Sequence, residues 1–278
     1  MKWNIIADSS CDYVAGADAP EDIRIAEVPF VINIGGKEYV DSADLDVAAM
    51  VDDMESSPEA SRTSCPAPGD WYEHFEQADC TIAVTISANL SGSYNSAVSA
   101  QEMLLEQHPE KKVFILNSRS AGSVLAMYVE KARDLIRSGC NFEAVVAQLE
   151  AYAKDRHTVF ALASFHNLVK NGRMSRLSGF IAGKLGIWGI GIASPEGTIK
   201  VKSKVRGMKH VLAAFIDDMK ENGFKGGDVV ISHCQNPELA AQLKENIQNL
   251  WAQAKVKILA TGGLCSYYAE RRGMIVSY

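Results

Sequence analysis

The sequence predicts an α/β protein built in two halves. Short apolar runs alternate with amphipathic helical patterns, which is typical of a parallel sheet covered by helices. This alternation is regular up to about residue 160, after which the chain enters a Gly-rich stretch and a hairpin pattern. We therefore expect an N-terminal α/β domain over residues 1–162, with a largely parallel, Rossmann-like sheet, and a C-terminal α/β domain over residues 163–278. Because no Pro- or Ser-rich linker separates the halves, we expect them to pack closely.

The elements of the first half follow from periodicity and turn residues. A buried strand ends in the polar loop Asp8-Ser9-Ser10-Cys11-Asp12, and Gly35-Gly36 turns the chain into a hairpin. A helix with one apolar face begins near Ala121 and ends at Gly139. The predicted strands are residues 3–7, 23–33 with a break at Pro29, 37–40, 81–86, 113–116 and 159–163. The other predicted helices are residues 44–54, 93–107 and 142–154, and residues 56–69 form a loop.

The second half contains a different set of elements. Residues 177–185 are expected to form a short helix in a Gly-rich setting, and Pro195-Glu196-Gly197 is expected to turn a hairpin. Amphipathic patterns predict helices over residues 208–222 and 237–251. The predicted strands are residues 190–194, 198–205, 229–232, 256–259 and 274–276.

The composition excludes several classes of protein. Of the 278 residues, 47% are hydrophobic and 22% are charged, and the formal net charge is −6. These values are typical of a globular protein and argue against a nucleic-acid binder, which needs a basic face. The N-terminus lacks the apolar core of a signal peptide, and the most apolar stretch, residues 179–193, is interrupted by Lys184 and five glycines. We therefore expect a cytoplasmic protein with no stable membrane insertion.

The sequence lacks the common signatures of catalysis and metal binding. It has no phosphate loop, dinucleotide-binding glycine pattern, zinc-protease motif or nucleophile elbow. The six histidines and six cysteines show no ligand spacing, so neither a zinc site nor a disulfide framework is expected. One enzymatic alternative stays open, a serine hydrolase with Ser64 or Ser91 as the nucleophile and His233 as the base.

Two loops rich in hydroxyl groups are candidates for binding an anion. The first, residues 62–71, contains Thr63 and Ser64 and is stiffened by prolines. The second joins a strand to a helix and places Ser91 and Gly92 at the helix N-terminus. Free N–H groups and a partial positive charge attract a carboxylate or phosphate there. Each loop also has a simpler interpretation as a helix cap.

Two basic features complete the candidates. Gly172 ends a short predicted helix, and Arg173 after it faces either an anionic ligand or solvent. Four cations alternate along a predicted strand and are therefore expected on one face: Lys200, Lys202, Lys204 and Arg206. We interpret this strand as a solvated edge strand that its lysines protect from aggregation, with a docking patch for an acidic partner as the alternative.

Taken together and in this order, four segments resemble the DegV family, and the resemblance covers nearly the whole chain. The segments are Asp8-Ser9-Ser10-Cys11-Asp12, Thr63-Ser64-Cys65-Pro66, Leu90-Ser91-Gly92-Ser93-Tyr94-Asn95-Ser96-Ala97 and Asn171-Gly172-Arg173-Met174-Ser175.

The resemblance implies two α/β domains with a ligand cleft between them, where an apolar tunnel holds a long-chain fatty acid. Similar proteins are fatty-acid-binding subunits of a bacterial fatty acid kinase. A separate, ATP-binding kinase subunit phosphorylates the carboxylate, and the binding subunit presents the fatty acid and holds the acyl phosphate. This chain is accordingly expected to be non-catalytic, to use no cofactor or metal, and to have the fatty acid as its ligand.

The same resemblance implies roles for individual residues. Thr63 or Ser64, together with Ser91, would hydrogen-bond the ligand carboxylate, and Gly92 would leave room for it. Arg173 would lie near the carboxylate or at the rim that faces the kinase. The candidate residues for the tunnel lining are Phe180, Ile181, Leu185, Trp188 and Ile190, and the alternative is that they belong to the ordinary core.

One stretch departs from the family pattern. Many relatives carry a His followed by Gly-Pro-Gly near the C-terminus, where this chain has Ala260-Thr261-Gly262-Gly263. Thr261, Ser266 or a tyrosine of this stretch is expected to replace the His as a donor. This departure leaves open a carrier or sensor of another amphiphilic anion, without phosphotransfer or a partner kinase. The serine hydrolase is a second, separate alternative.

Overall fold

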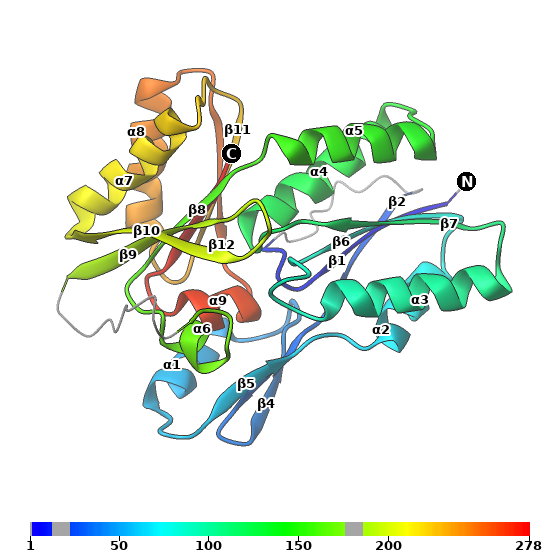
Figure 1. The fold of residues 1–278 in the computed structure, drawn as a ribbon, viewed down its shortest axis with the longest axis horizontal. Helices are drawn as coiled ribbons and strands as arrows, with labels where there is room; N and C mark the ends of the chain where they lie inside the picture. Colours follow the sequence, from blue (N-terminus) through cyan, green and yellow to red (C-terminus); the bar gives the residue numbers. More distant parts are fainter. Residues whose placement is uncertain (1, 13–22, 176–185) are drawn as a thin grey trace.

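The computed structural model describes residues 2–12, 23–175 and 186–278, which form three sheets and their covering helices (Figure 1). The first sheet has four parallel strands in the order β2-β1-β6-β7. Every residue of the two central strands is buried, as expected for a sheet covered on both faces. The strands are β1 (Trp3–Asp8), β2 (Ile23–Val28), β6 (Cys80–Thr85) and β7 (Lys112–Asn117).

Two pairs of helices cover the faces of the first sheet. Because successive side chains of a strand point to opposite faces, Ile6 packs against α2 (Pro68–Phe75) and α3 (Ser93–Gln107). Its neighbour Ile5 packs on the other face, against α4 (Ser123–Arg137) and α5 (Phe142–Lys154). The first half of the chain thus has the doubly covered parallel sheet that its sequence predicts.

The second sheet has six strands in the order β10-β9-β8-β13-β11-β12. Only β11 and β12 are parallel neighbours, and the other pairs are antiparallel. Helices α7 (Met208–Glu221) and α8 (Pro237–Leu250) cover one face. The strands are β8 (Thr158–Leu162), β9 (Ile187–Ala193), β10 (Ile199–Arg206), β11 (Asp228–His233), β12 (Lys255–Ala260) and β13 (Met274–Ser277).

A small third sheet lies below the junction of the two large ones in Figure 1. It is antiparallel, with strand order β4-β3-β5, and packs with two helices. Its strands are β3 (Val31–Ile34), β4 (Lys37–Val40) and β5 (Ser61–Ser64), and the helices are α1 (Val47–Ser56) and α9 (Gly263–Ala269). A short helix, α6 (His166–Lys170), also contacts α9.

The structure confirms the α/β class and differs from the sequence predictions in particular elements. Strand β5 falls in the stretch predicted as a loop, and α9 was not predicted. The helix predicted over residues 177–185 lies outside the described residues. Strand β8 ends at Leu162 and pairs with β13 and β9 of the second sheet. The division into domains of residues 1–162 and 163–278 stays a prediction.

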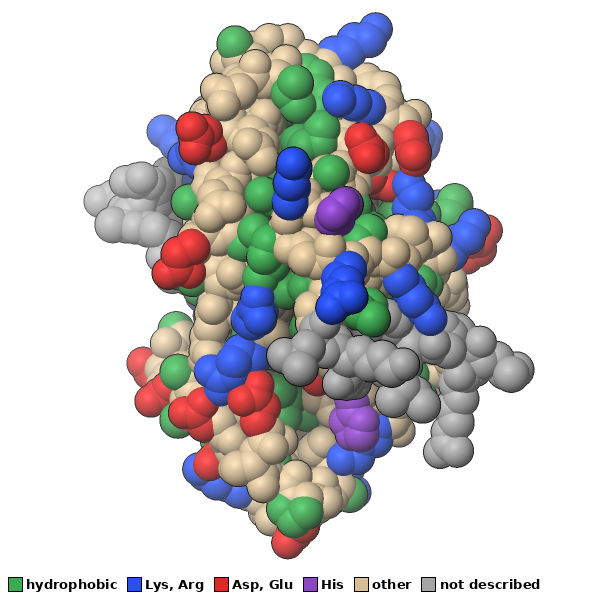
Figure 2. Space-filling model, turned by 90° about the vertical axis from the view of Figure 1, so that its left-hand side faces the viewer, with side chains coloured by type: hydrophobic (Ala, Val, Ile, Leu, Met, Phe, Trp, Pro, Cys, Tyr) green, Lys and Arg blue, Asp and Glu red, His purple; other side chains and the backbone are tan. Residues whose placement is uncertain are grey.

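Strand β10 is an edge strand, as predicted, but its four cations do not share a face. The register shifts between Val201 and Ser203, which leaves Lys202 as a bulge. Lys200 lies opposite Ile192, on the face that α7 covers. Lys204 and Arg206 lie opposite Gly189 and Ile187, on the other face. The prediction of a single cationic face is therefore wrong, because the bulge reverses the face to which each side chain beyond it points. Figure 2 shows that Lys and Arg side chains at this end of the molecule are interspersed with hydrophobic ones.

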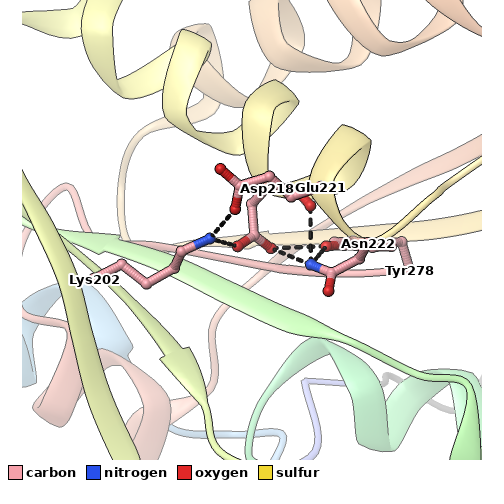
Figure 3. A network of polar contacts seen from close by, with 5 residues as sticks. All are labelled: Lys202, Asp218, Glu221, Asn222 and Tyr278. Atoms are coloured by element: carbon pink, nitrogen blue, oxygen red, sulfur yellow. Dashed lines mark hydrogen bonds and ion pairs between the residues drawn. The ribbon is translucent and has the colours of Figure 1, made fainter.

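The bulged Lys202 belongs to a network that fixes the edge of the second sheet (Figure 3). Its Nζ lies 2.6 Å from Oδ1 of Asp218 and 2.6 Å from Oε2 of Glu221, both on α7. The hydroxyl of Tyr278 donates to the other oxygen of Asp218 at 2.7 Å. The Asp218 carboxylate is buried, so these partners supply the donors that it loses from water.

Candidate functional site

A pocket lies where the first sheet meets the second. It contains about 840 Å³ of space between the atoms, open solvent at its mouth included. The carboxyl ends of β1, β6 and β7 supply Ser10, Ile86 and Ser120, and such strand ends are where open α/β sheets bind ligands. The face of the second sheet that α7 and α8 leave uncovered forms the opposite wall.

The wall from the second sheet is apolar for most of its length. Thr158, Phe160 and Leu162 alternate along β8, so all three point into the pocket, whereas Val159 and Ala161 pack toward α7. On β9, Gly189 and Gly191 lie opposite Leu162 and Phe160. A Cβ at Gly191 would lie 2.3 Å from the ring of Phe160, so this glycine lets the ring lie flat against the strand. The glycines thus set how far the aromatic wall stands from the opposite side.

Two predicted tunnel residues point away from this pocket. Trp188 and Ile190 alternate with the glycines of β9 and pack into the core beneath α7. Neither lines the pocket. Their side chains therefore belong to the other face of the sheet, because the sequence does not show which face a strand turns to a cavity. Phe180, Ile181 and Leu185 lie outside the described residues.

The strand ends below the pocket are held together by a buried carboxyl group. Both oxygens of Asp8 accept hydrogen bonds: Oδ1 from the amide and hydroxyl of Ser10, at 3.2 and 2.5 Å, and Oδ2 from the amide of Ile86 at 2.9 Å. The hydroxyl of Ser93 at the start of α3 also donates to Oδ2, at 2.6 Å. Burial raises the pKa of the Asp8 carboxyl, and these bonds oppose the rise. Asp8 thus ties the end of β1 to the loop after β6.

Two more carboxyl groups accept hydrogen bonds from the stretch that departs from the family pattern, which begins at Ala260. Asp41 accepts the amides of Gly263 and Leu264 at 2.6 and 2.8 Å, and Asp12 accepts the amide of Gly262 at 3.0 Å. Burial raises the pKa of Asp12 to about 6. The three amides at the start of α9 are therefore used by the protein itself. The role of Asp41 was missed, because no local pattern links it to a helix more than 200 residues away.

A fourth carboxyl group, that of Glu27, lies near these three. Burial raises its pKa to about 8, and the charges of Asp41, Asp8 and Asp12 add to the rise.

In the described part of the chain, no group of His, Cys, Asp or Glu side chains is arranged to hold a metal ion. The same residues include no helix that is both long and apolar enough to cross a membrane.

One end of the pocket gathers the polar groups expected for an anion. Thr63 on β5, Ser91, Arg173 and Tyr268 all line it, and a Cβ at Gly92 would lie 3.2 Å from the Cys65 sulfur, which brings the loop after Thr63 to the loop of Ser91. The Thr63 and Tyr268 hydroxyls are 2.8 Å apart and share a hydrogen bond. The Arg173 guanidinium donates to the backbone oxygens of Leu90 and Asn171, at 3.1 and 2.5 Å. Because these acceptors are neutral, they orient the guanidinium without compensating its charge.

The other predicted donors do not reach the pocket. Ser64 follows Thr63 on β5 and is exposed on the opposite side of the strand. Gly92 precedes α3, and a Cβ there would lie 3.2 Å from the Cys65 sulfur. The hydroxyls of Thr261 and Ser266 lie 2.7 Å apart and bond to each other. The sequence did not specify which tyrosine of this stretch would act as a donor. In the structure Tyr268, on α9, lines the pocket.

The arrangement does not support a serine hydrolase. His233 does not line the pocket, and its Nδ1 accepts the amide of Asn236 at 3.2 Å. Among the described residues, no hydrogen bond connects His233 to Ser64 or Ser91, whereas a general base must lie within reach of its nucleophile. An apolar cavity in which the described residues place hydroxyl groups and the Arg173 guanidinium at one end is suited to binding an amphiphilic anion.

Comparison with known proteins agrees with this geometry. Residues 2–278 match the model of a family described as "Uncharacterised protein, DegV family". A DegV domain-containing protein of Streptococcus pneumoniae is 41% identical over 278 residues, which is 100% of this chain and 99% of that protein.

Two solved structures have closely similar folds. One is the fatty acid kinase (Fak) B3 protein of Streptococcus pneumoniae, loaded with linoleic acid. It has a TM-score of 0.97, is 41% identical, and the match covers 100% of this chain and 99% of that one. The other is a DegV family protein of Eubacterium eligens loaded with heptadecanoic acid, with a TM-score of 0.94, 35% identity and coverage of 99% and 98%. The match over the full length, in sequence and in structure, shows that this chain belongs to the DegV family.

Proposed function

We propose that this protein binds a long-chain fatty acid in the pocket between its sheets. The observation that carries the proposal is the pocket itself, an apolar cavity with Thr63, Ser91, Arg173 and Tyr268 gathered at one end. Relatives with closely similar folds were solved with linoleic and heptadecanoic acid bound, which supports the same class of ligand here.

The energetics of such a ligand match the two parts of the pocket. Each CH₂ group moved from water into the apolar part contributes about 0.8 kcal/mol. An ionised carboxylate buried without donors would cost several kcal/mol, roughly offsetting a large part of that gain. The hydroxyls of Thr63 and Tyr268 lie within hydrogen-bond distance of each other. A carboxylate bound next to them and to Ser91 would receive hydrogen bonds in place of those that it loses from water. Arg173 adds a positive charge at the same end.

We further propose that the protein serves a separate, ATP-dependent kinase in the cytoplasm as its non-catalytic subunit. The support is its similarity to a protein named for fatty acid kinase. A subunit of this kind needs a carboxylate held by donors that can be exchanged, and neutral hydroxyl groups can serve as such donors. The hydroxyls of Thr63, Ser91 and Tyr268 are such donors.

The first test compares fatty-acid binding by Ser91→Ala, Thr63→Val and a control, Ser64→Ala. Native mass spectrometry of the purified protein gives the bound lipid, and titration with oleic acid gives Kd. Loss of one donor to a buried carboxylate should weaken binding by about 1–3 kcal/mol in the first two variants. Ser64 is exposed on the same strand, so its variant should bind as the native protein does. Equal affinity in all three variants would rule out the assignment of the carboxylate site.

The second test concerns the partner. The purified protein with bound oleic acid is mixed with the ATP-binding subunit of a bacterial fatty acid kinase and ATP, and acyl phosphate is measured. Acyl phosphate that forms only when both proteins are present supports the kinase role. Tight fatty-acid binding without any acyl phosphate would instead indicate a carrier without phosphotransfer.

A further inference from the structure

The pocket has a second group of hydroxyls, separate from the end that gathers Thr63 and Arg173. Thr158, Phe160 and Leu162 follow one another along the same face of β8, so Thr158 lies about 13 Å from Leu162. Leu162 belongs to the same apolar cluster as Leu168 of α6, and the Leu168 carbonyl oxygen accepts the Arg173 amide at 2.9 Å. The Thr158 end of this wall is therefore the far end from the guanidinium.

Ser120 and Thr198 belong to this far end. Ser120, Thr158 and Ala193 line the pocket. Val159 pairs with Ile192, so their neighbours Thr158 and Ala193 lie side by side, and a Cβ at Gly197 would lie 2.9 Å from the Cα of Arg119, the residue before Ser120. Thr198 lies in the β9–β10 hairpin close to Ala193, and it lines the pocket too. The far end thus presents three hydroxyl groups, those of Ser120, Thr158 and Thr198, in an otherwise apolar cavity.

The Ser120 hydroxyl has no hydrogen-bond partner among the described residues. The Oγ atom is buried, and the Ser120 residue as a whole is only 6% exposed. A buried hydroxyl without a partner is unfavourable and is uncommon in native proteins. Because Ser120 lines the pocket, a ligand group can supply the partner that the protein does not.

The two threonines are ready to bind the same kind of group. Thr158, Ser277 and Ser123 form a row of hydroxyls with spacings of 2.9 and 2.8 Å. The three hydroxyls have three protons, and their two mutual hydrogen bonds use two of them. Thr158, at the end of the row, therefore offers the pocket either its own proton or a lone pair, depending on the direction of these bonds. Thr198 is paired in the same way with Ser194 at 2.9 Å. An alcohol, which both donates and accepts, fits every state of these groups, whereas a ketone only accepts.

We propose that the pocket takes fatty acids that carry a hydroxyl group on the distal half of the chain, with Ser120 and Thr158 as its partners. The inference rests on the proposed function and adds a ligand class to it. The carboxylate binds at the Thr63 end, the methylene groups lie along Phe160 and Leu162, and the distal hydroxyl meets the far end.

The experiment compares two acids that differ by one hydroxyl. Ricinoleic acid is oleic acid with a hydroxyl beyond its double bond, and both are titrated into the native protein and into Ser120→Ala. In the native protein, Kd for ricinoleic acid should equal or fall below that for oleic acid. In Ser120→Ala, ricinoleic acid should bind about tenfold more weakly, while oleic acid binds unchanged or slightly more tightly. The Ser120 hydroxyl makes no bond in the protein, so the variant is expected to fold.

A matched control separates the pocket from burial in general. Thr81 on β6 also has a buried hydroxyl without a partner among the described residues, but it does not line the pocket. Thr81→Val should therefore leave the ratio of the two Kd values unchanged. A series of hydroxystearic acids then locates the preferred carbon, and the corresponding oxo acid should bind less tightly than the best hydroxy acid.

The outcomes distinguish this inference from the proposed function. If oleic acid binds but ricinoleic acid binds more than about fivefold more weakly to the native protein, an unpartnered hydroxyl is being buried and the inference is wrong. The same conclusion follows if Ser120→Ala leaves the ratio of Kd values unchanged, and the fatty-acid-binding function then still stands. If neither acid binds, both the function and the inference fail.

Discussion

The two large sheets meet the pocket in different ways. The first sheet meets it end-on, through the loops that follow β1, β6 and β7, and these loops carry Ser10, Ser91 and Ser120. The second sheet meets it face-on, through Phe160 and Leu162. Strand ends have unpaired backbone groups and hydroxyl side chains, whereas a sheet face has only the side chains of alternate residues.

Because of this difference, the two surfaces suit different parts of an amphiphilic ligand. The strand ends can bind polar groups, and the sheet face can bury methylene groups. The two surfaces also differ in what holds them in place. The loops after β1 and β6 are fixed by hydrogen bonds to the buried carboxyl group of Asp8. The sheet face is fixed by close packing of rings against glycines. Three predictions test this contrast.

The largest effect is expected from Asp8→Asn. Oδ1 and Oδ2 of Asp8 each accept a backbone amide, from Ser10 and Ile86. An Asn side chain has one acceptor oxygen, so its NH₂ group would face one of these amides. We expect a loss of about 2–3 kcal/mol in the free energy of unfolding, measured by urea denaturation. Asp79→Asn, at an exposed site, is the control. Equal stability of the two variants would show that the loops do not depend on Asp8.

A smaller effect, on binding, is expected from Gly191→Ala. The new methyl group would lie 2.3 Å from the Phe160 ring and 3.0 Å from the Lys200 carbonyl oxygen, so the ring must move toward the pocket. We expect a loss of about 1–3 kcal/mol in binding of long fatty acids, with a smaller loss for shorter ones. Titration with a series of saturated acids measures both. Gly69→Ala, where a Cβ would meet no atom within 4 Å, should not change the length preference. A uniform loss across the series would contradict a role for this wall in selecting chain length.

The smallest effect is expected from Glu27→Gln and depends on pH. The pKa of Glu27 rises from 4.5 to about 8 on folding, so the folded protein binds this proton more tightly than the unfolded chain. The stability that the protonated group contributes is complete below about pH 4.5 and is lost as the pH rises toward 8. Because Glu27 keeps some solvent contact, we expect Glu27→Gln to gain about 1 kcal/mol at pH 8.

Urea unfolding of the native protein and of this variant between pH 5 and pH 8 gives the test. The slope of stability against pH should be flatter in Glu27→Gln than in the native protein, and a residual slope of the same sign should come from Asp12. Glu102→Gln, on the exposed side of α3, is the control. If stability rises with pH equally in all three proteins, the raised pKa values do not govern it.

Local patterns in the sequence predicted most of the fold. The helix over residues 93–107 begins and ends where α3 does, because an apolar repeat and a polar start define it. The stretch of residues 56–69 was predicted as a loop because of its prolines, yet Ser61–Ser64 pairs with β3 and forms β5. Its strand character comes from that pairing and not from its own residues.

The candidate site was predictable only in part. Thr63, Ser91 and Arg173 belong to recognisable motifs and do line the pocket. By contrast, the face of β9 that carries Trp188 turns away from it. Alternation shows that Trp188 and Gly189 point to opposite sides, but not which side holds a cavity. Long-range packing decides such questions, as it does for the bulge at Lys202.

The position of β13 has a consequence for how the protein is made. Residues 274–277 form an inner strand between β8 and β11, so they join parts of the sheet that are far apart in the sequence. Their pairing with β8 closes a loop of more than 100 residues, which makes it a slow step. The first sheet is complete once β7 has emerged from the ribosome. The second cannot close until residues 274–277 are synthesised. During translation, the apolar face destined for the pocket therefore stays open, and this is the period in which the nascent chain is most prone to aggregate.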